Sequence, residues 1–313
     1  MLAVPLQFLI GIIWTMFHRS RIILIHLTLI LTLGLSACGS LFGTKATPTP
    51  VGPTSTPVPP TATPEPMALT VNGEGVTVTE FNAELARYKS AQAALGKTVN
   101  DTDASKAVIE DLIAQVLLAQ GAKAAGFDLS ESALQSRVDA LTKQLGGAGK
   151  LSAWESGHGY IDATFRVALK RSAEAAWMRD KIVNAVPTTA DQVHAQQILF
   201  LNTDDANSAL AQLKGGADFN ALAVQSDPTT HGDLGWFPKG YLLDQKIEDA
   251  AFSLQAGQFS DVIQTDIGFQ IIKVLERDPQ HPLSPDAYLS QQELALKNWV
   301  TQQRTQAAIV LAP

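Results

Sequence analysis

The residues that most often carry covalent or metal chemistry, cysteine and clustered histidine, are sparse in this sequence. Cys38 is the only cysteine, which excludes an intramolecular disulfide framework and a cysteine-rich zinc site. His158 and His281 stand alone, and no stretch has the pattern of a phosphate-binding loop, a metal cluster or a nucleophilic triad. The sequence therefore predicts no cofactor and no metal.

The overall composition narrows the class of protein. The 313 residues carry 23 basic and 30 acidic side chains, a net charge of -7. This balance argues against a nucleic-acid-binding protein, because such proteins concentrate lysine and arginine. Apolar residues make up 46% of the chain, which is enough for a packed core. At about 150 residues per domain, the length indicates roughly two domains.

Cys38 follows an apolar segment directly. Arg19 and Arg21 precede the apolar residues 22–35, and small residues come next, an order typical of a secretory signal peptide. The string Leu-Ser-Ala-Cys-Gly at residues 35–39 resembles the lipobox of bacterial lipoproteins. This resemblance implies cleavage before Cys38 and attachment of a lipid to its sulfur, which would anchor the protein to the cell membrane.

Residues 1–37 are therefore interpreted as a signal peptide that starts at Met1 or at Met16. The alternative is a pair of hydrophobic hairpin segments, although each is about 15 residues long and a membrane-spanning helix needs about 20. Residues 38–66 are interpreted as the lipidated cysteine and a linker. Eight of the sixteen prolines lie in its last nineteen positions, and such a segment adopts extended polyproline II structure.

Residues 67–187 have helical periodicity after a short extended segment with a turn at Asn72. Apolar residues recur at spacings of three and four in four stretches, the last from about Tyr160 to Val186. These faces either pack on one another or line a cradle for unfolded chains. The strings Ala68–Glu74 and Val78–Phe81 resemble the opening of the helical chaperone domain in SurA-like and PrsA-like proteins.

The pattern changes in residues 188–279, where short strands and helices alternate in the order βαα-β-α-ββ. Several strings there resemble the parvulin-type (PpiC, or rotamase) peptidyl-prolyl cis-trans isomerases. The matching strings are Val193–Phe200, Gly216–Ala223, Ser226–Pro228, Gly232–Phe237, Ile247–Phe252 and Gly268–Val274. Together with the preceding helical domain, the resemblance implies an α+β protein that acts as an extracytoplasmic foldase lipoprotein of the PrsA type.

The implied reaction is rotation about the bond that precedes a proline. The two isomers are close in energy but exchange slowly, in tens to hundreds of seconds. Catalysis needs only tighter binding of the twisted amide than of either planar form. A dry apolar cup for the proline ring and a few fixed polar groups suffice for this.

The resemblance assigns the polar groups to four positions. Asp227 and Thr265 match the family's acidic and hydroxyl positions, whereas Gln197 and Gln270 stand where the family has two histidines. Glutamine can donate and accept hydrogen bonds but cannot take up a proton near neutral pH. We expect the glutamines to retain a hydrogen-bonded network that orients Asp227 or Thr265. His194 is expected on the opposite face of the strand from Gln197.

The same resemblance places the proline cup at Leu234, Leu243 and Ile247. The turn before Leu243 is one residue longer than usual, which leaves Leu242 as the alternative. Phe237 is expected to support the cup, whereas Phe252 is better explained by core packing.

Residues 280–313 begin with a helix start signal, Ser284 followed by Pro285 at the first helical position. Because a lone amphipathic helix must bury its apolar face, we expect this C-terminal helix to pack back on the helical domain. The expected partners are unfolded or nascent secreted polypeptides with X–Pro bonds. Two rival interpretations are a weakly active or inactive binding chaperone, favoured by the two glutamines, and a generic lipoprotein adaptor.

Overall fold

A computed structural model describes residues 65–312. The predicted signal peptide, Cys38 and most of the linker lie outside the described residues. No helix in the described range is long and apolar enough to cross a membrane. In chain order the elements are β1 (Met67–Val71), β2 (Glu74–Thr77), α2 (Val78–Ala94), α3 (Asp101–Ala124), α4 (Glu131–Leu145), α5 (Ala148–Gly157), α6 (Asp162–Asn184), β3 (Thr189–Phe200), α7 (Thr203–Lys214), α8 (Phe219–Ser226), β4 (Asp233–Pro238), α9 (Gln245–Ser253), β5 (Ile263–Thr265), β6 (Gly268–Pro282), α10 (Pro285–Gln306) and β7 (Ile309–Leu311).

The N-terminal strands form a hairpin with the tight turn that the sequence predicts. Val71 pairs with Glu74, and the two turn residues, Asn72 and Gly73, have φ angles of 52° and 83°. Positive φ at both central positions is the requirement of a type I′ turn, which asparagine and glycine satisfy. A third strand, β7, pairs with β1 from the far end of the sequence. Its pairing was not predicted.

Side-chain caps define where the helices of this part begin. Thr77, Asn100 and Ser130 accept hydrogen bonds from the backbone amides of α2, α3 and α4 respectively, as good N-cap residues do. The α3 helix packs its buried Val108, Leu112 and Val116 against the β1–β2 hairpin. The α5 helix was missed in the sequence because it follows two glycines and has no side-chain N-cap bond.

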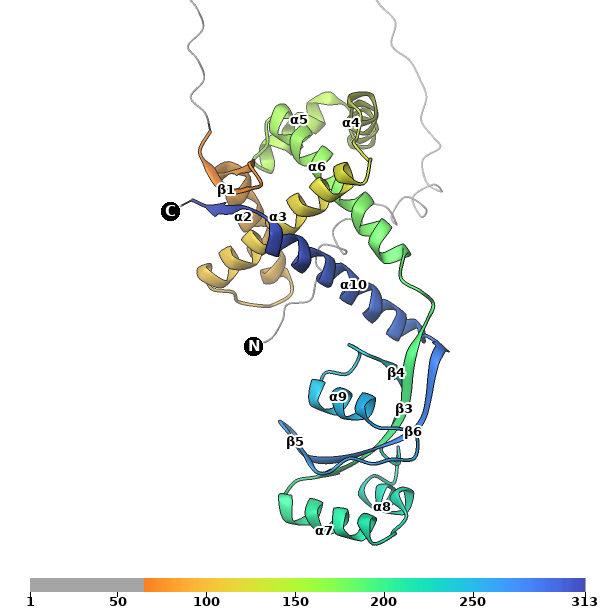
Figure 1. The fold of residues 1–313 in the computed structure, drawn as a ribbon. Helices are drawn as coiled ribbons and strands as arrows, with labels where there is room; N and C mark the ends of the chain where they lie inside the picture. Colours follow the sequence, from red (N-terminus) through yellow and green to blue (C-terminus); the bar gives the residue numbers. More distant parts are fainter. Residues whose placement is uncertain (1–64, 313) are drawn as a thin grey trace, which may run out of the picture. The chain divides into compact units, whose positions relative to one another are not determined.

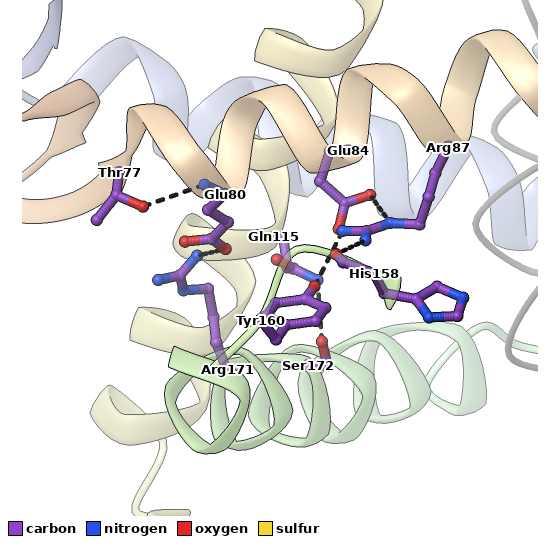
Figure 2. A network of polar contacts seen from close by, with 9 residues as sticks. All are labelled: Thr77, Glu80, Glu84, Arg87, Gln115, His158, Tyr160, Arg171 and Ser172. Atoms are coloured by element: carbon purple, nitrogen blue, oxygen red, sulfur yellow. Dashed lines mark hydrogen bonds and ion pairs between the residues drawn. The ribbon is translucent and has the colours of Figure 1, made fainter. Parts of the chain in front are cut away.

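A polar network ties α2 to α6 and to the turn that precedes α6 (Figure 2). Arg171 is 3% exposed, and its Nη1 donates to Glu80 at 2.6 Å. Arg87 donates to the carbonyl oxygen of His158 at 3.0 Å and to the hydroxyl of Tyr160 at 2.9 Å. Separating Arg171 from Glu80 would leave a buried charge without a partner, which is energetically costly. These pairs therefore restrict how the helices pack.

The second part is built on a four-stranded antiparallel sheet with the order β4-β3-β6-β5. The α9 helix covers one face, and α7 and α8 cover the other (Figure 1). Each face holds its own apolar cluster. The cluster under α9, here called the α9 cluster, has as its buried members Val193, Ala195, Phe237, Ile247, Ala251, Ile272 and Val274. The predicted α+β order of strands and helices is confirmed.

The C-terminal helix α10 begins as the sequence predicts. The Ser284 hydroxyl accepts from the amide of Ala287 at 3.2 Å, and proline occupies the first turn. Leu296 of α10 is buried against Leu118 and Ala175 of the helical part, with Trp299 packed beside them. The expected return of this helix to the helical domain is confirmed.

Candidate active site

Gln197 and Gln270 lie on the same face of the sheet, on the two neighbouring strands β3 and β6. Gln197 pairs directly with Ile272, a buried member of the α9 cluster. Directly paired residues share a face of a sheet, and so do residues two apart in one strand. Gln270 is therefore on the face that carries the α9 cluster.

Gln270 is fixed by Thr265, which comes from the short edge strand β5. The Gln270 Nε2 atom donates to the Thr265 hydroxyl at 3.0 Å. The same hydroxyl donates to the carbonyl oxygen of Gly268 at 3.0 Å. Gln270 is 2% exposed and Thr265 is 8% exposed, so this polar pair sits in a largely dry environment, where hydrogen bonds are electrostatically strong.

Asp227 ends α8 and uses its carboxylate within its own turn. It accepts hydrogen bonds from the amides of Thr229 and Thr230 at 3.0 and 3.1 Å, and from the Thr230 hydroxyl. These bonds lower the pKa of Asp227 to about 2, and the bond from the Thr230 hydroxyl has the largest effect. Asp227 is thus an anion at neutral pH that shapes the loop after α8.

That loop is held against the segment of β3 that carries Gln197. The Ser226 hydroxyl donates to the carbonyl oxygen of Leu199 at 3.0 Å. The backbone amide of Gln197 donates to the carbonyl oxygen of Gly232 at 2.8 Å. A Cβ atom on Gly232 would lie 1.9 Å from the Gln197 carbonyl oxygen, so glycine is required at this approach. The preceding residue, His231, has a φ of 56°.

The structure thus joins two of the four predicted polar residues by a direct hydrogen bond, Thr265 and Gln270. Within residues 65–312, neither Asp227 nor the Gln197 side chain is hydrogen-bonded to that pair. Gln197 is partly exposed, and its side-chain amide has no hydrogen-bond partner in this part of the chain. The two glutamines therefore differ, since a hydrogen bond holds the Gln270 side chain and none within residues 65–312 holds that of Gln197.

The apolar residues of the predicted cup divide into a floor and a rim. Phe237 and Ile247 are buried, at 0% and 4% exposure, and form the floor within the α9 cluster. Leu234 and Leu242 pack against the α9 cluster while remaining partly exposed. Leu243, the leucine that the sequence favoured, lies outside this cluster with a fully exposed side chain. Of the two leucines considered for this position, Leu242 is the one that packs on the cluster.

Ile263 also packs against the α9 cluster and was not singled out in the sequence. It precedes Thr265 by two positions on β5, so both side chains point to the same face. Side chains two positions apart in a strand share a face, so the spacing of Ile263 from Thr265 could have predicted its place beside the site.

The histidine nearest in sequence to Gln197 serves another part of the sheet. His194 Nε2 lies 2.8 Å from an Asp233 carboxylate oxygen, and its ring stacks on Trp236 with centroids 5.6 Å apart. His194 is an odd number of positions from Gln197 and points to the opposite face, as expected. Asp233 also accepts a hydrogen bond from the Gly235 amide at 2.8 Å, as an aspartate in a turn commonly does.

Comparison with known protein families matches both parts of the chain. Residues 181–278 match the PPIC-type PPIASE domain, and residues 61–154 match the SurA-like N-terminal domain. The chain therefore contains a PPIC-type PPIASE domain and a SurA-like N-terminal domain, as the resemblance of its sequence strings implies. The hydrogen-bonded pair Gln270–Thr265 and the α9 cluster both lie inside residues 181–278.

Similar proteins include foldases named PrsA. The chain is 29% identical over 192 residues to a foldase protein PrsA of Geobacillus sp. (strain WCH70), and the match covers 57% of this chain and 66% of the relative. It is 36% identical over 89 residues to the foldase protein PrsA of Bacillus subtilis (strain 168), covering 27% of this chain and 30% of the relative. The chain thus spans less than two thirds of these relatives.

Among solved structures, the chain is similar to the peptidylprolyl isomerase PrsA from Bacillus cereus. That structure is 19% identical, with a TM-score of 0.40, and the match covers 74% of this chain and 83% of that chain.

Proposed function

We propose that this parvulin catalyses cis–trans rotation of X–Pro bonds in unfolded secreted polypeptides, outside the cytoplasm. The observation that carries the proposal is the hydrogen bond between Gln270 and Thr265 on the sheet face that also holds the apolar floor of Phe237 and Ile247. The match of residues 181–278 to the PPIC-type domain supports the same reaction.

The reaction needs no covalent step. Peptide rotation has a barrier of about 18–20 kcal/mol because twisting removes amide resonance. Seating the proline ring on Leu234, Leu242 and Ile247 would place the twisting bond in a site with little water. There the fixed polar groups stabilise the charge that becomes localised on the carbonyl oxygen and nitrogen of the twisted amide.

The two glutamines have separate roles in this proposal. Gln270 Nε2 donates to the Thr265 hydroxyl, and because Gln270 is 2% exposed, its role is to fix the polar floor of the site without touching the client. Gln197, partly exposed at the site, binds the client backbone with its free amide. Asp227 acts as a fixed anion that holds the loop after α8, and no proton transfer is required of it.

The location outside the cytoplasm is supported by the relatives, which include the periplasmic chaperone PpiD of Haemophilus influenzae, 37% identical over 92 residues. A lipid anchor on Cys38, followed by the proline-rich linker, would tether the parvulin to the membrane surface. Two acyl chains or more are needed for a stable anchor of this kind.

The deciding experiment follows the cis-to-trans relaxation of short X–Pro peptides with residues 65–313, which form one compact unit. Acceleration is expected in the wild type, and at a peptide concentration below KM a several-fold weaker acceleration is expected in Leu234→Ala. The matched control is Lys214→Ala, which removes an exposed side chain paired with Asp261 on the other side of the sheet. Without acceleration for any X, the enzyme proposal fails and the binding chaperone becomes the working account.

A further inference from the structure

Glu248 is a buried carboxylate to which the sequence assigned no role. It follows the cup residue Ile247 in α9 and is 5% exposed. Burying a carboxylate is costly unless it is well hydrogen-bonded. Among the described residues its partners are backbone amides, and no lysine or arginine forms an ion pair with it.

Three consecutive amides converge on this carboxylate. The N–H of Gly240 donates to one oxygen at 2.7 Å, and those of Tyr241 and Leu242 donate to the other at 2.9 and 3.1 Å. The next turn is held in the same way, since Asp244 accepts from the amides of Lys246 and Ile247. The segment 240–244 is therefore fixed at both ends by buried or partly buried carboxylates.

Fixing this segment decides which side chain enters the cup. Leu242 packs against the α9 cluster, whereas its neighbour Leu243 is fully exposed. A shift of the segment by one residue would exchange the two leucines. The carboxylate thus sets both the position of Leu242 and its distance from Ile247, the residue before Glu248.

We propose that Glu248 is the positioning residue of the proline cup. This role rests on the function proposed above. It touches no client atom and acts through Leu242. Because the cup binds the proline ring in the planar and twisted states alike, a misplaced Leu242 weakens binding uniformly. Uniform loss of binding raises KM and leaves kcat unchanged.

The test compares Glu248→Gln, Glu248→Ala and Leu242→Ala by peptide relaxation at increasing peptide concentration. We expect Glu248→Ala to raise KM by about tenfold with kcat changed less than about threefold. Glu248→Gln keeps one acceptor oxygen but presents an N–H pair to the amides, so an intermediate KM is expected. The double variant Glu248→Ala/Leu242→Ala should raise KM no further than the larger single effect.

A stability control separates positioning from general damage. Leu213→Ala removes a buried side chain from the opposite face of the sheet, and it should lower the unfolding midpoint without moving KM. Amide hydrogen exchange at residues 240–242 should accelerate in Glu248→Ala and not in Leu213→Ala. An unchanged KM in folded Glu248→Ala, or an equal rise in Leu213→Ala, would overturn the positioning role.

The same experiment separates the two proposals. If the wild type accelerates relaxation and Glu248→Ala keeps its KM, only the positioning role is lost. If the wild type neither accelerates relaxation nor binds the peptide in an NMR titration, the isomerase proposal and the positioning role both fail.

Discussion

The Gln270 side chain donates a 3.0 Å hydrogen bond to the Thr265 hydroxyl, across the pair of strands that closes the second sheet. The hydroxyl in turn donates a hydrogen bond to the carbonyl oxygen of Gly268 at 3.0 Å. A glutamine at a position where the family has histidine is therefore an ordered member of the site. Its geometry depends on hydrogen bonding and not on a titrating ring.

Removal of the Thr265 hydroxyl should damage both stability and activity. In Thr265→Val the buried Gln270 amide loses its acceptor, which we expect to cost about 1–3 kcal/mol in the free energy of unfolding. The rate of X–Pro rotation should fall at least about tenfold, as for loss of an oriented polar group. Urea unfolding and peptide relaxation measure the two effects. Thr265→Ser, which keeps the hydroxyl, should retain most of both, and equal losses in the two variants would contradict the role of the hydroxyl.

The wild-type rate should show no histidine-like inflection between about pH 5.5 and 8, because the polar set has no group that titrates there. The double variant Gln197→His/Gln270→His should acquire one near the ordinary histidine pKa of about 6.5. Relaxation rates measured across this pH range check both statements. An inflection already present in the wild type would contradict the prediction that the site works without a titrating group.

Leu242 and Leu243 provide a direct test of the cup. Leu242→Ala should raise the KM of an X–Pro peptide by about 3- to 30-fold, the usual effect of losing one apolar contact in a pocket. Leu243→Ala should have the smaller effect, since its side chain does not pack on Phe237 or Ile247. Steady-state kinetics of the two single variants decide between the leucines. A larger effect of Leu243→Ala would place the client on the outer side of this loop.

Asp111 in α3 should make the helical part less stable as the pH rises. Burial, with the neighbouring charge of Glu84, raises the pKa of Asp111 to about 6 from an ordinary 3.8. The folded state therefore keeps its proton to a higher pH than the unfolded state, so stability declines as the pH rises from about 4 through 6. Asp111→Asn should add about 1–2 kcal/mol to the free energy of unfolding at pH 7, since two pKa units correspond to about 2.7 kcal/mol before solvent screening.

Denaturant unfolding of Asp111→Asn at pH 4 provides the control, because the gain should disappear once Asp111 is protonated in both states. A gain that is the same at both pH values would show that charge is not its cause. Glu84→Gln should reproduce a smaller part of the effect by removing the neighbouring anion.

Asp227 should show the opposite pH dependence. The hydrogen bonds from Thr230 and Thr229 lower its folded-state pKa to about 2. Its contribution to stability is therefore present above the unfolded-state pKa and is lost as the pH falls toward 2. Asp227→Asn should lower the thermal midpoint at pH 7 and leave it unchanged near pH 2. Equal midpoints at pH 7 would show that the turn does not need the charge.

Much of the fold was predictable because its signals are local. The Asn72-Gly73 turn, the Ser284 cap with Pro285, and the order of strands and helices in residues 188–279 each depend on residues close together in sequence. The family strings placed Gln197, Gln270 and Thr265 on a common site before any geometry was known. The two features missed, α5 and β7, have weak local signals, and β7 is ordered by pairing with a strand from the other end of the described chain.

The site was less predictable than the fold. The resemblance of the sequence strings assigned Gln197, Gln270 and the apolar cup residues to one site, and strand alternation placed His194 on the other face of β3. Tertiary structure alone decided that Gln270 bonds Thr265, that Leu242 packs on the α9 cluster while Leu243 is exposed, and that Glu248 accepts hydrogen bonds from three consecutive amides. The physical reason is that periodicity specifies which way a side chain points, whereas a hydrogen-bond partner depends on ångström-scale distances between segments that meet only in the folded chain.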